Sequence, residues 1–387
     1  MSNLIISSDL TELPLLDTEL LYVNPPYLLN PDNYDAITKS VTEEILHQIR
    51  FGYYVGLGCT YPRFDLDSFF YKMKTNPVYQ ELPDKNPKHM DFDLITNSRA
   101  IKLRQVAEKY ERVYLFWSGG IDSTLVLCAI LKNWAPPELN KLTVVLNDFS
   151  IAEHPEFFRK FIQNKLLVAN SDEFYSGVIK LNSRSLYLTG DLGDPIFGYG
   201  PIYEFDKKYP GLYKQPWKKN IEKLIEYFSV AGPESGIFAM NHIMESLDRS
   251  QVEVDTVYDL LWWLDFNWGY DFDLYYLLWL FPASGGEIHP KKFMEENVFL
   301  FFNSKEYQNW AMTTINTNLK IGDTVNTHKI SAKTYIYEFD RDSDYFTSKL
   351  KVSSISMTPG WYTSKRIFAI DTSYNLYYVE PSIWLSK

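Results

Sequence analysis

Two glycine-rich acidic segments hold the side chains of this chain that are best suited to bind phosphate and a metal ion. The first, residues 118–123, reads Ser-Gly-Gly-Ile-Asp-Ser. Its glycines let the backbone approach a charged ligand closely, and its serine hydroxyls can donate hydrogen bonds. Asp122 supplies a carboxylate, which is a hard oxygen ligand of the kind that Mg²⁺ prefers. The segment is therefore a candidate phosphate loop.

The position of this segment supports that interpretation. An apolar strand is predicted over Val113–Trp117, and an amphipathic helix from about Ser123 to Trp134. The start of a helix presents backbone N–H groups and the positive end of the helix dipole, and both attract phosphate. A plain Ser-Gly-Gly turn capped by Asp122 is the simpler alternative.

The second segment begins about 70 residues further along the chain and follows another apolar run, Leu186–Leu188. It carries Asp191 and Asp194, two carboxylates three residues apart on a glycine-rich loop. One of them could hold Mg²⁺ while the other accepts a proton. Taken alone, Asp-Leu-Gly-Asp is also a common turn composition.

Together the two segments resemble the SGGxDS phosphate loop and the SGDGGDELFGGY-type loop of the asparagine synthetase and β-lactam synthetase family. That family belongs to the ATP pyrophosphatase superfamily, whose members cleave ATP between its α- and β-phosphates. The resemblance covers roughly residues 100–340 and implies ATP and Mg²⁺ as cofactors. By this resemblance Asp122 and Asp194 are the Mg²⁺ ligands, and Asp191 helps to accept a proton. It also implies ATP contacts from Ser118, Gly119, Gly120, Asp122, Ser123 and Gly190.

Two further matches to the family are fainter. The predicted strand Leu142–Asn147 ends where the family has a backbone segment that contacts adenine, so the resemblance assigns Leu146 and Asn147 to ATP. An ordinary strand end with an Asn turn is an equal alternative. Lys333 resembles a family lysine, at the start of a late helix, that offsets the negative charge developed on phosphate during adenylation. Lys329 is the substitute candidate, and a solvated helix lysine is the simple alternative.

The chain departs from the family in three ways. Pro195 stands where the family usually has Glu, which puts the choice of nucleophile in doubt. Ser2 stands where asparagine synthetases carry the glutaminase cysteine, and the region before the phosphate loop is too short for a glutaminase domain. We therefore expect the nucleophile to be free ammonia, a substrate amine, or ammonia from a separate donor.

The elements predicted around the two loops indicate an α/β fold. A second helix is predicted from about Pro155 to Val168, and apolar runs at Val178–Leu181 and Leu186–Leu188 complete a βαβ series. Such a series predicts a parallel sheet with its ligand site at the carboxyl ends of the strands. The resemblance implies a core of the adenine nucleotide alpha hydrolase-like (HUP) type. Successive helices are expected from Pro216 to about Trp310, and a hairpin over 366–379.

Two regions are expected along the chain. Residues 1–100 are rich in proline and irregular, with short β-like pieces such as Tyr53–Leu57, and we interpret them as an N-terminal accessory region. Residues 101–387 are expected to form the ATP pyrophosphatase or synthetase domain with a helical extension.

Composition narrows the classes of protein that fit. The formal net charge of −11 opposes unaided binding to nucleic acid, because phosphate contacts need clustered Lys and Arg. The most apolar run, Val257–Phe281, is interrupted by four aspartates, so it is not expected to span a membrane. Two cysteines and an N-terminus without a signal-peptide pattern favour the cytoplasm. The six histidines show no paired metal-ligand spacing, which gives no support for a zinc site.

The sequence hypothesis is an AMP-forming amide ligase. ATP and Mg²⁺ would adenylate a small-molecule carboxylate, pyrophosphate would leave, and an amine or ammonia would attack the activated carbonyl. Two alternatives stay open at this point. One is activation of a nucleobase or another oxygen by the same chemistry, and the other is a degenerate, non-catalytic nucleotide-binding protein.

Overall fold

The computed structural model describes the chain in several stretches. Side chains are described for most of residues 83–84, 86–175, 178–229, 232–248, 250, 252–270, 290–314, 320 and 328–349. The backbone alone is described for 4–7, 20–23, 367–371 and 376–379. The β-like piece predicted at Tyr53–Leu57 lies outside these stretches.

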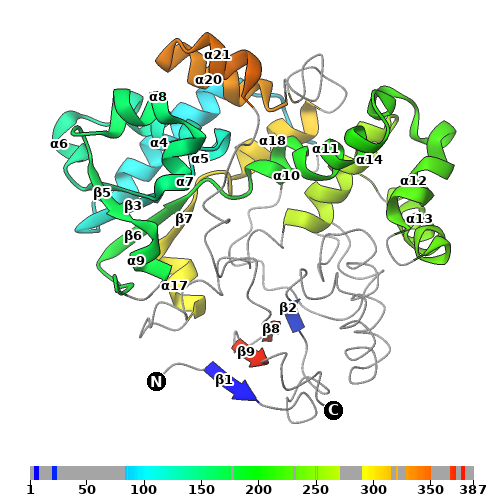
Figure 1. Cartoon of the computed structure of the whole chain (residues 1–387), viewed down its shortest axis with the longest axis horizontal. Helices are drawn as coiled ribbons and strands as arrows, with labels where there is room; N and C mark the ends of the chain where they lie inside the picture. The colour runs from blue at the N-terminus through cyan, green and yellow to red at the C-terminus, as the bar shows by residue number, and fades with distance from the viewer. Residues whose placement is uncertain are drawn as a thin grey trace.

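A five-stranded parallel sheet lies at the centre of the α/β part (Figure 1), in the order β5-β4-β3-β6-β7. Its strands are β3 Arg112–Phe116, β4 Leu142–Leu146, β5 Leu167–Asn170, β6 Ser185–Thr189 and β7 Val298–Leu300. Every residue of β4 and β6 is buried, as expected of inner strands in a parallel sheet. Counted along the chain the order is 3-2-1-4-5, so the topology switches direction between β3 and β6. In open α/β sheets the ligand crevice lies at such a switch, beyond the carboxyl ends of the strands.

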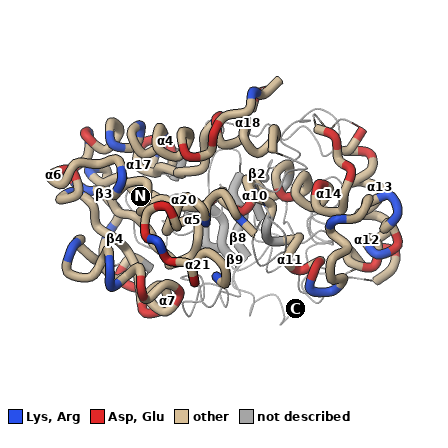
Figure 2. The backbone as a smooth tube through the Cα atoms, turned by 90° about the horizontal axis from the view of Figure 1, so that it is seen from above, with Lys and Arg blue, Asp and Glu red and all other residues tan. Residues whose placement is uncertain are grey.

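The main helices beside this sheet pack on one another. The helix α5, Ile121–Asn133, contacts both α4, Phe92–Ala107, and α20, Ile330–Asp340, and Figure 2 shows α5 beside α20. The aromatic rings of Tyr114 and Tyr187, on β3 and β6, stack with centroids 5.5 Å apart. The remaining short helices of this part are α6 Pro136–Leu139, α7 Asp148–Glu153, α8 Pro155–Phe157, the π-helix η4 Phe158–Ile162, α9 Ser171–Tyr175, α17 Pro290–Asn297, α18 Lys305–Thr313 and α21 Ser343–Ser348.

A helical region follows β6. It consists of α10 Gly193–Phe197, α11 Tyr199–Lys208, η5 Leu212–Lys214, η6 Trp217–Asn220, α12 Ile221–Phe228, α13 Pro233–Leu247, α14 Val257–Leu264 and the π-helix η7 Asp265–Gly269. Two hydrogen bonds tie α14 to α10: Trp262 Nε1 donates to the carbonyl of Ile196 at 3.2 Å, and Tyr258 donates to that of Phe197 at 2.8 Å. A Cβ at Gly198, whose φ is +75°, would lie 2.6 Å from Trp262. The second acidic segment is therefore anchored on a buried aromatic helix.

Strands from both ends of the chain form a second, four-stranded sheet. Its strands are β1 Leu4–Ser7, β2 Leu20–Val23, β8 Ile367–Asp371 and β9 Leu376–Val379. The order is β1-β9-β8-β2, with β1 parallel to β9 and the other pairs antiparallel. The hairpin predicted over 366–379 is thus confirmed as β8 and β9.

Most predicted elements of the α/β part are confirmed. The strands predicted at Val113–Trp117 and Leu142–Asn147, and the helix from Ser123 to Trp134, differ from the observed bounds by one or two residues. The predicted run Leu186–Leu188 lies inside β6. The α/β class and the parallel sheet are confirmed as well. None of the described helices is long and apolar enough to cross a membrane.

Three expectations were wrong in detail. The helix predicted from Pro155 to Val168 ends at Ile162, and its last residues belong to β5, an edge strand whose side chains are largely exposed. The run Val178–Leu181 forms no strand, and Val178 is 71 % exposed. The stretch read as successive helices also contains β7, which has only three residues. Short edge strands bury too few side chains to leave a clear alternation in the sequence.

The helix α4 runs across residue 100, where the accessory region was expected to end. Its residues Ala100 and Leu103 are fully buried in the core of the α/β part. Arg99, on the same helix, donates from Nε to the carbonyl of Phe301 at 2.8 Å and from Nη2 to that of Leu300 at 2.9 Å. The packing thus joins α4 to the end of β7, while the division of the chain into domains stays a prediction.

We expect Arg99→Met to lower the free energy of unfolding by about 2–4 kcal/mol, because buried carbonyls at the end of β7 would lose their donor. Lys102→Met, on the exposed side of the same helix, should change it by no more than about 0.5 kcal/mol. Urea unfolding followed by circular dichroism measures both values. Equal losses in the two variants would contradict this role of Arg99.

Candidate functional site

Hydrogen bonds of side chains fix the conformation of the loop after β3 and tie it to the start of α5. Trp117 is fully buried and donates from Nε1 to the hydroxyl of Thr124 at 3.1 Å, which fixes the loop to α5. The hydroxyl of Ser123 accepts from the backbone N–H of Ser118 at 3.1 Å and lies 3.0 Å from the Ser118 hydroxyl. Gly120, at the N-cap of α5, offers no side-chain acceptor to the helix. The positive end of the helix dipole therefore lies beside the loop, which suits an anion such as phosphate.

Gly119 needs to be glycine for two reasons. Its φ of +74° lies in the left-handed region, and a Cβ there would overlap the carbonyl oxygen of Ser150 and lie 2.8 Å from Cβ of Glu153. Glu153, at the end of α7, is itself buried and accepts from Lys349 Nζ at 2.5 Å. The phosphate loop is thus packed directly on α7 without room for a side chain.

The second acidic loop lies on the start of α5. A Cβ at Gly190 would lie 2.9 Å from the backbone nitrogen of Ser123, and one at Gly193 would lie 2.5 Å from Cγ of Asp122. Leu192, between these two glycines, has a left-handed φ of +72°. These close contacts place two segments that are about 70 residues apart in the chain side by side.

A buried lysine joins the two loops. Lys329 Nζ forms ion pairs with Asp122 Oδ2 and with Asp194 Oδ1, the second at 2.5 Å, and its side chain is only 3 % exposed. Lys329 precedes α20 and has a left-handed φ of +54°. Burial alone would lower the pKa of its ammonium, but the charges of Asp122 and Asp194 and the hydrogen bonds to them outweigh burial and raise it. The ammonium is therefore charged at neutral pH.

Two further carboxyls beside this ion-pair cluster hold protons unusually well. Burial raises the pKa of Asp191 to about 6; a hydrogen bond with Thr189 opposes this shift, while the charges of Asp122 and Asp194 add to it. Burial likewise raises the pKa of Asp265, at the start of η7, to about 8; the charge of Asp194 adds to that shift and the charge of Lys329 opposes it. Oδ2 of Asp265 is buried and has no hydrogen-bond partner among the described residues. Both groups could exchange protons near neutral pH.

The structure brings most of the predicted site residues together. The ligand-binding residues predicted in the first loop lie around the start of α5. The residues predicted in the second loop pack against that helix start. Asn147 N-caps α7 and accepts from the N–H of Ser150 at 3.1 Å, while Leu146 ends β4 beside β3. Pro195, the departure from the family pattern, is buried in α10.

The two candidate lysines differ in their surroundings. Lys333, which the resemblance favoured, is fully buried and donates to the backbone carbonyl of Lys349 at 3.2 Å. Burial, together with the nearby charges of Lys349 and Lys329, lowers its pKa to about 8. The substitute candidate, Lys329, is the lysine that contacts the predicted metal-binding carboxylates.

Sequence reasoning missed Asp265 and the pair of Glu153 and Lys349. Asp265 lies in the apolar run Val257–Phe281, whose aspartates served only to argue against a membrane span. An acid inside a largely apolar run was a usable signal, because such a group is rarely buried without a role. Nothing in the sequence pointed to the pairing of Glu153 with Lys349, since 196 positions separate them.

We expect Gly119→Ala to lower the free energy of unfolding by about 3 kcal/mol or more, since it combines a strained backbone with a steric clash. Gly211 is a matched control: its φ is +79°, but nothing lies within 4 Å of its Cβ position. Gly211→Ala should therefore cost only about 1–2 kcal/mol, the backbone strain alone. Similar losses for both variants in urea unfolding would show that α7 yields to the added methyl group.

A pH dependence follows from the raised pKa of Asp265. Between pH 4 and the folded-state pKa of about 8, unfolding releases the proton of Asp265, so the native state loses stability as the pH rises. The slope approaches about 1.4 kcal/mol per pH unit. Asp265→Asn removes this term, so the variant should gain stability relative to the wild type from pH 5 to pH 8. Asp248→Asn, at an exposed helix end, should show a constant difference in the same urea series.

No family model, curated protein or solved structure that was compared matches this chain. The fold itself is an α/β fold with a five-stranded parallel sheet in the order 3-2-1-4-5, an order found in Rossmann-like and HUP-type sheets. The candidate site occupies the switch point of that sheet, at the carboxyl ends of β3 and β6.

Proposed function

We propose that this chain is an ATP- and Mg²⁺-dependent enzyme that transfers AMP to a substrate carboxylate, releases pyrophosphate, and joins the activated acyl group to an amine or ammonia. One observation carries the proposal. The carboxylates of Asp122 and Asp194, which follow β3 and β6, converge on a single cation, the ammonium of Lys329. They do so at the sheet position where open α/β folds bind ligands.

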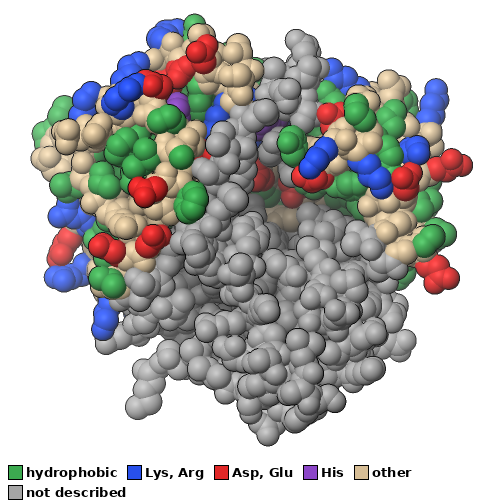
Figure 3. All heavy atoms as spheres, viewed as in Figure 1, with side chains coloured by type: hydrophobic (Ala, Val, Ile, Leu, Met, Phe, Trp, Pro, Cys, Tyr) green, Lys and Arg blue, Asp and Glu red, His purple; other side chains and the backbone are tan. Residues whose placement is uncertain are grey.

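The residues at this position fit Mg²⁺ bound together with phosphate. Mg²⁺ in nucleotide sites is usually held by one or two carboxylates together with substrate phosphates, and Asp122 and Asp194 supply that donor set. Asp194 is half-exposed, so the cluster is reached from outside. In Figure 3 a recess opens between the sheet part and the helical part, and acidic side chains are visible within it. Bound Mg²⁺ would offset the negative charge of the phosphates.

The phosphate loop would hold the nucleotide by its backbone. Gly119 lets the loop pack directly on α7, Gly120 is the N-cap of α5, and the hydroxyls of Ser118 and Ser123 belong to the same loop. Leu146 and Asn147 end the neighbouring strand, in the position proposed for the adenine. A HUP-type core, a more specific assignment than an α/β fold with a parallel sheet, fits this arrangement.

Lys329 is the better candidate for the lysine that stabilises charge during adenylation. Its ammonium is fixed beside both metal-binding carboxylates, and a fixed cation stabilises charge that builds up on phosphate oxygens. Lys333 lies one turn further along α20 and hydrogen-bonds the backbone near Lys349. We therefore assign the catalytic role to Lys329 and a supporting role to Lys333.

The raised pKa values of Asp191 and Asp265 support the second half of the reaction. An attacking amine must lose protons, and a base works best when its pKa lies near the working pH. Asp191 carries the role expected from sequence. Asp265 adds a buried carboxyl close to Asp194, in a site where Pro195 replaces the acid usual in the family.

The substrates of this proposed reaction are small molecules. The acyl donor carries a carboxylate, and the acceptor is an amine, free ammonia, or ammonia delivered by a separate protein. The net charge of −11 and the low cysteine count favour a cytoplasmic enzyme that does not bind nucleic acid. In Figure 2 acidic and basic residues are interspersed along α12 and α13.

Pyrophosphate release from ATP and Mg²⁺, with pools of amino acids and other small carboxylates, tests the proposal. Wild type should release pyrophosphate with one pool only, and Asp122→Asn should lower that rate at least about 100-fold through loss of a metal ligand. The exposed substitution Asp248→Asn is the control and should keep the rate. Pyrophosphate release that persists in Asp122→Asn would refute the assigned roles.

Three additional measurements separate the alternatives. If a carboxylate labelled with heavy oxygen passes its label to AMP, the carboxylate is the adenylated group; label from a nucleobase oxygen would favour the other substrate class. A larger loss of rate in Lys329→Met than in Lys333→Met would support the choice of lysine. ATP binding without turnover in any pool would favour a non-catalytic nucleotide-binding protein.

A further inference from the structure

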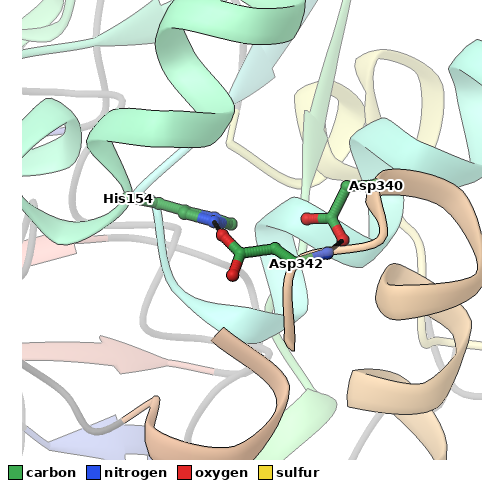
Figure 4. Close-up of side chains that lie close together, drawn as sticks. All are labelled: His154, Asp340 and Asp342. Carbon is green, nitrogen blue, oxygen red and sulfur yellow. Dashed lines mark hydrogen bonds and ion pairs between the residues drawn. The ribbon is translucent and has the colours of Figure 1, made fainter. Parts of the chain in front are cut away.

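A second group of metal-ligating side chains lies away from the Asp122–Asp194 cluster. His154, between α7 and α8, faces Asp340 at the end of α20 and Asp342 at the N-cap of α21 (Figure 4). One ligand atom from each of the three residues lies within 4.8 Å of the other two. Two segments that are far apart in the chain, one with His154 and one with Asp340 and Asp342, therefore direct potential ligands at one point.

Among the described residues, no hydrogen bond engages the ring nitrogens of His154. Its side chain is 4 % exposed, and neither Nδ1 nor Nε2 has a hydrogen-bond partner among the described residues. The nearest acidic oxygen, Asp342 Oδ2, is 4.0 Å from Nε2, which is too far for a hydrogen bond. Buried imidazole nitrogens are normally satisfied, so the part of the chain that the structure describes leaves this ring without the partner that its burial requires.

The ring is held rigidly in this orientation. It stacks on Tyr345 with centroids 3.9 Å apart and planes 10° apart, and it also packs on Phe157. Burial lowers the pKa of His154 to about 3, the charge of Lys349 adds to this shift, and the charge of Asp342 opposes it.

The two carboxylates are oriented by the turn between α20 and α21. Oδ1 of Asp342 accepts from the backbone N–H of Tyr345 at 2.9 Å, so Oδ2 is turned toward His154. Oδ1 of Asp340 accepts from the backbone N–H of Asp342 at 2.8 Å. Such second contacts fix the direction of a carboxylate ligand, as outer-shell partners do in known metal sites.

The positive charges described near these three residues do not prevent a cation from binding there. Lys349, the buried lysine nearest to His154, is neutralised by Glu153 at 2.5 Å. Lys160 is exposed and donates to the backbone carbonyl of Asp340 at 2.5 Å. The two aspartates therefore face a buried imidazole, and a divalent cation would balance their negative charge.

We propose that His154, Asp340 and Asp342 bind a divalent transition-metal ion, with Zn²⁺ as the ion of the site. Zinc accepts imidazole nitrogen and carboxylate oxygen at about 2.0–2.2 Å, and small side-chain shifts would close the present spacing to those distances. Mg²⁺ and Ca²⁺ prefer sites made of oxygen alone, so the imidazole selects against them. The side chain of Asp342 is 27 % exposed, which gives the ion a path to the site.

The position of this site gives it a structural function. Glu153, the residue before His154, packs on Gly119 of the phosphate loop. Asp340 ends the helix that begins after Lys329. A metal ion held by His154, Asp340 and Asp342 would clamp the support of the phosphate loop to the helix that carries the bridging lysine.

Zinc binding to the full-length chain tests the proposal in the absence of ATP. The protein is stripped with a chelator, dialysed against Zn²⁺, and analysed for metal content and for affinity by competition with a chromophoric chelator; Co²⁺ then serves as a spectroscopic probe of the ligands. His154→Phe removes the ligand nitrogens and keeps the ring that stacks on Tyr345. Asp342→Asn removes the charge and keeps an N-cap side chain. Asp344→Asn, exposed on the same helix, is the matched control, and Asp122→Asn accounts for metal bound elsewhere.

We expect wild type and Asp344→Asn to bind one zinc ion more per chain than His154→Phe, and Asp122→Asn to bind one more than the double variant Asp122→Asn/His154→Phe. Asp342→Asn should bind it at least about tenfold more weakly, because loss of outer-shell partners alone already costs 10- to 100-fold. Zinc should also raise the melting temperature of wild type and not that of His154→Phe. Equal zinc content in wild type and His154→Phe, with native circular dichroism spectra for both, would overturn the proposal. So would a wild-type protein that binds no zinc.

Discussion

The ion-pair cluster around Lys329 is the interaction on which the candidate site depends. Asp122 and Asp194 lie in the first turns of the helices that follow the adjacent strands β3 and β6, and without a cation between them their charges would repel each other across a short distance. Asp191 and Asp265 add two more carboxyls to the same neighbourhood, and their raised pKa values show how this crowding and burial favour protonated forms. A single buried ammonium thus holds together an arrangement that is otherwise electrostatically unfavourable.

Close packing supplies the second constraint. The glycines at 119, 190 and 193 leave no space for side chains, so each loop rests directly on its neighbour. The buried aromatic residues of α14 hold α10 from the far side. Because both loops are fixed by contacts outside the site, the carboxylates are positioned before any ligand arrives, which is the condition for efficient binding and catalysis.

The sequence predicted the parts of the site that lie within short segments. The phosphate loop shows a strand, two glycines and a helix in a row, and each has a local sequence signal. The choice between Lys329 and Lys333 could not be made in this way, because it depends on the left-handed turn at Lys329 that starts α20. The group around His154 could not be predicted from the sequence for a similar reason. Its ligands come from two segments that only tertiary packing brings together, whereas spacing rules detect ligands that are close in sequence.

The strands also differ in how far their partners lie along the chain. The strands β3 to β6 pair within a stretch of 78 residues, from Arg112 to Thr189, so all four are synthesised well before the C-terminal part of the chain. The sheet that joins β1 to β9 needs residues near both ends, so during synthesis it can close only after residue 379 has left the ribosome. Until then β1 has no partner strand in that sheet and presents unpaired backbone groups, the situation in which chains are most exposed to wrong pairing. Among the described strands, the first in the sequence, β1, therefore pairs only with the last, β9.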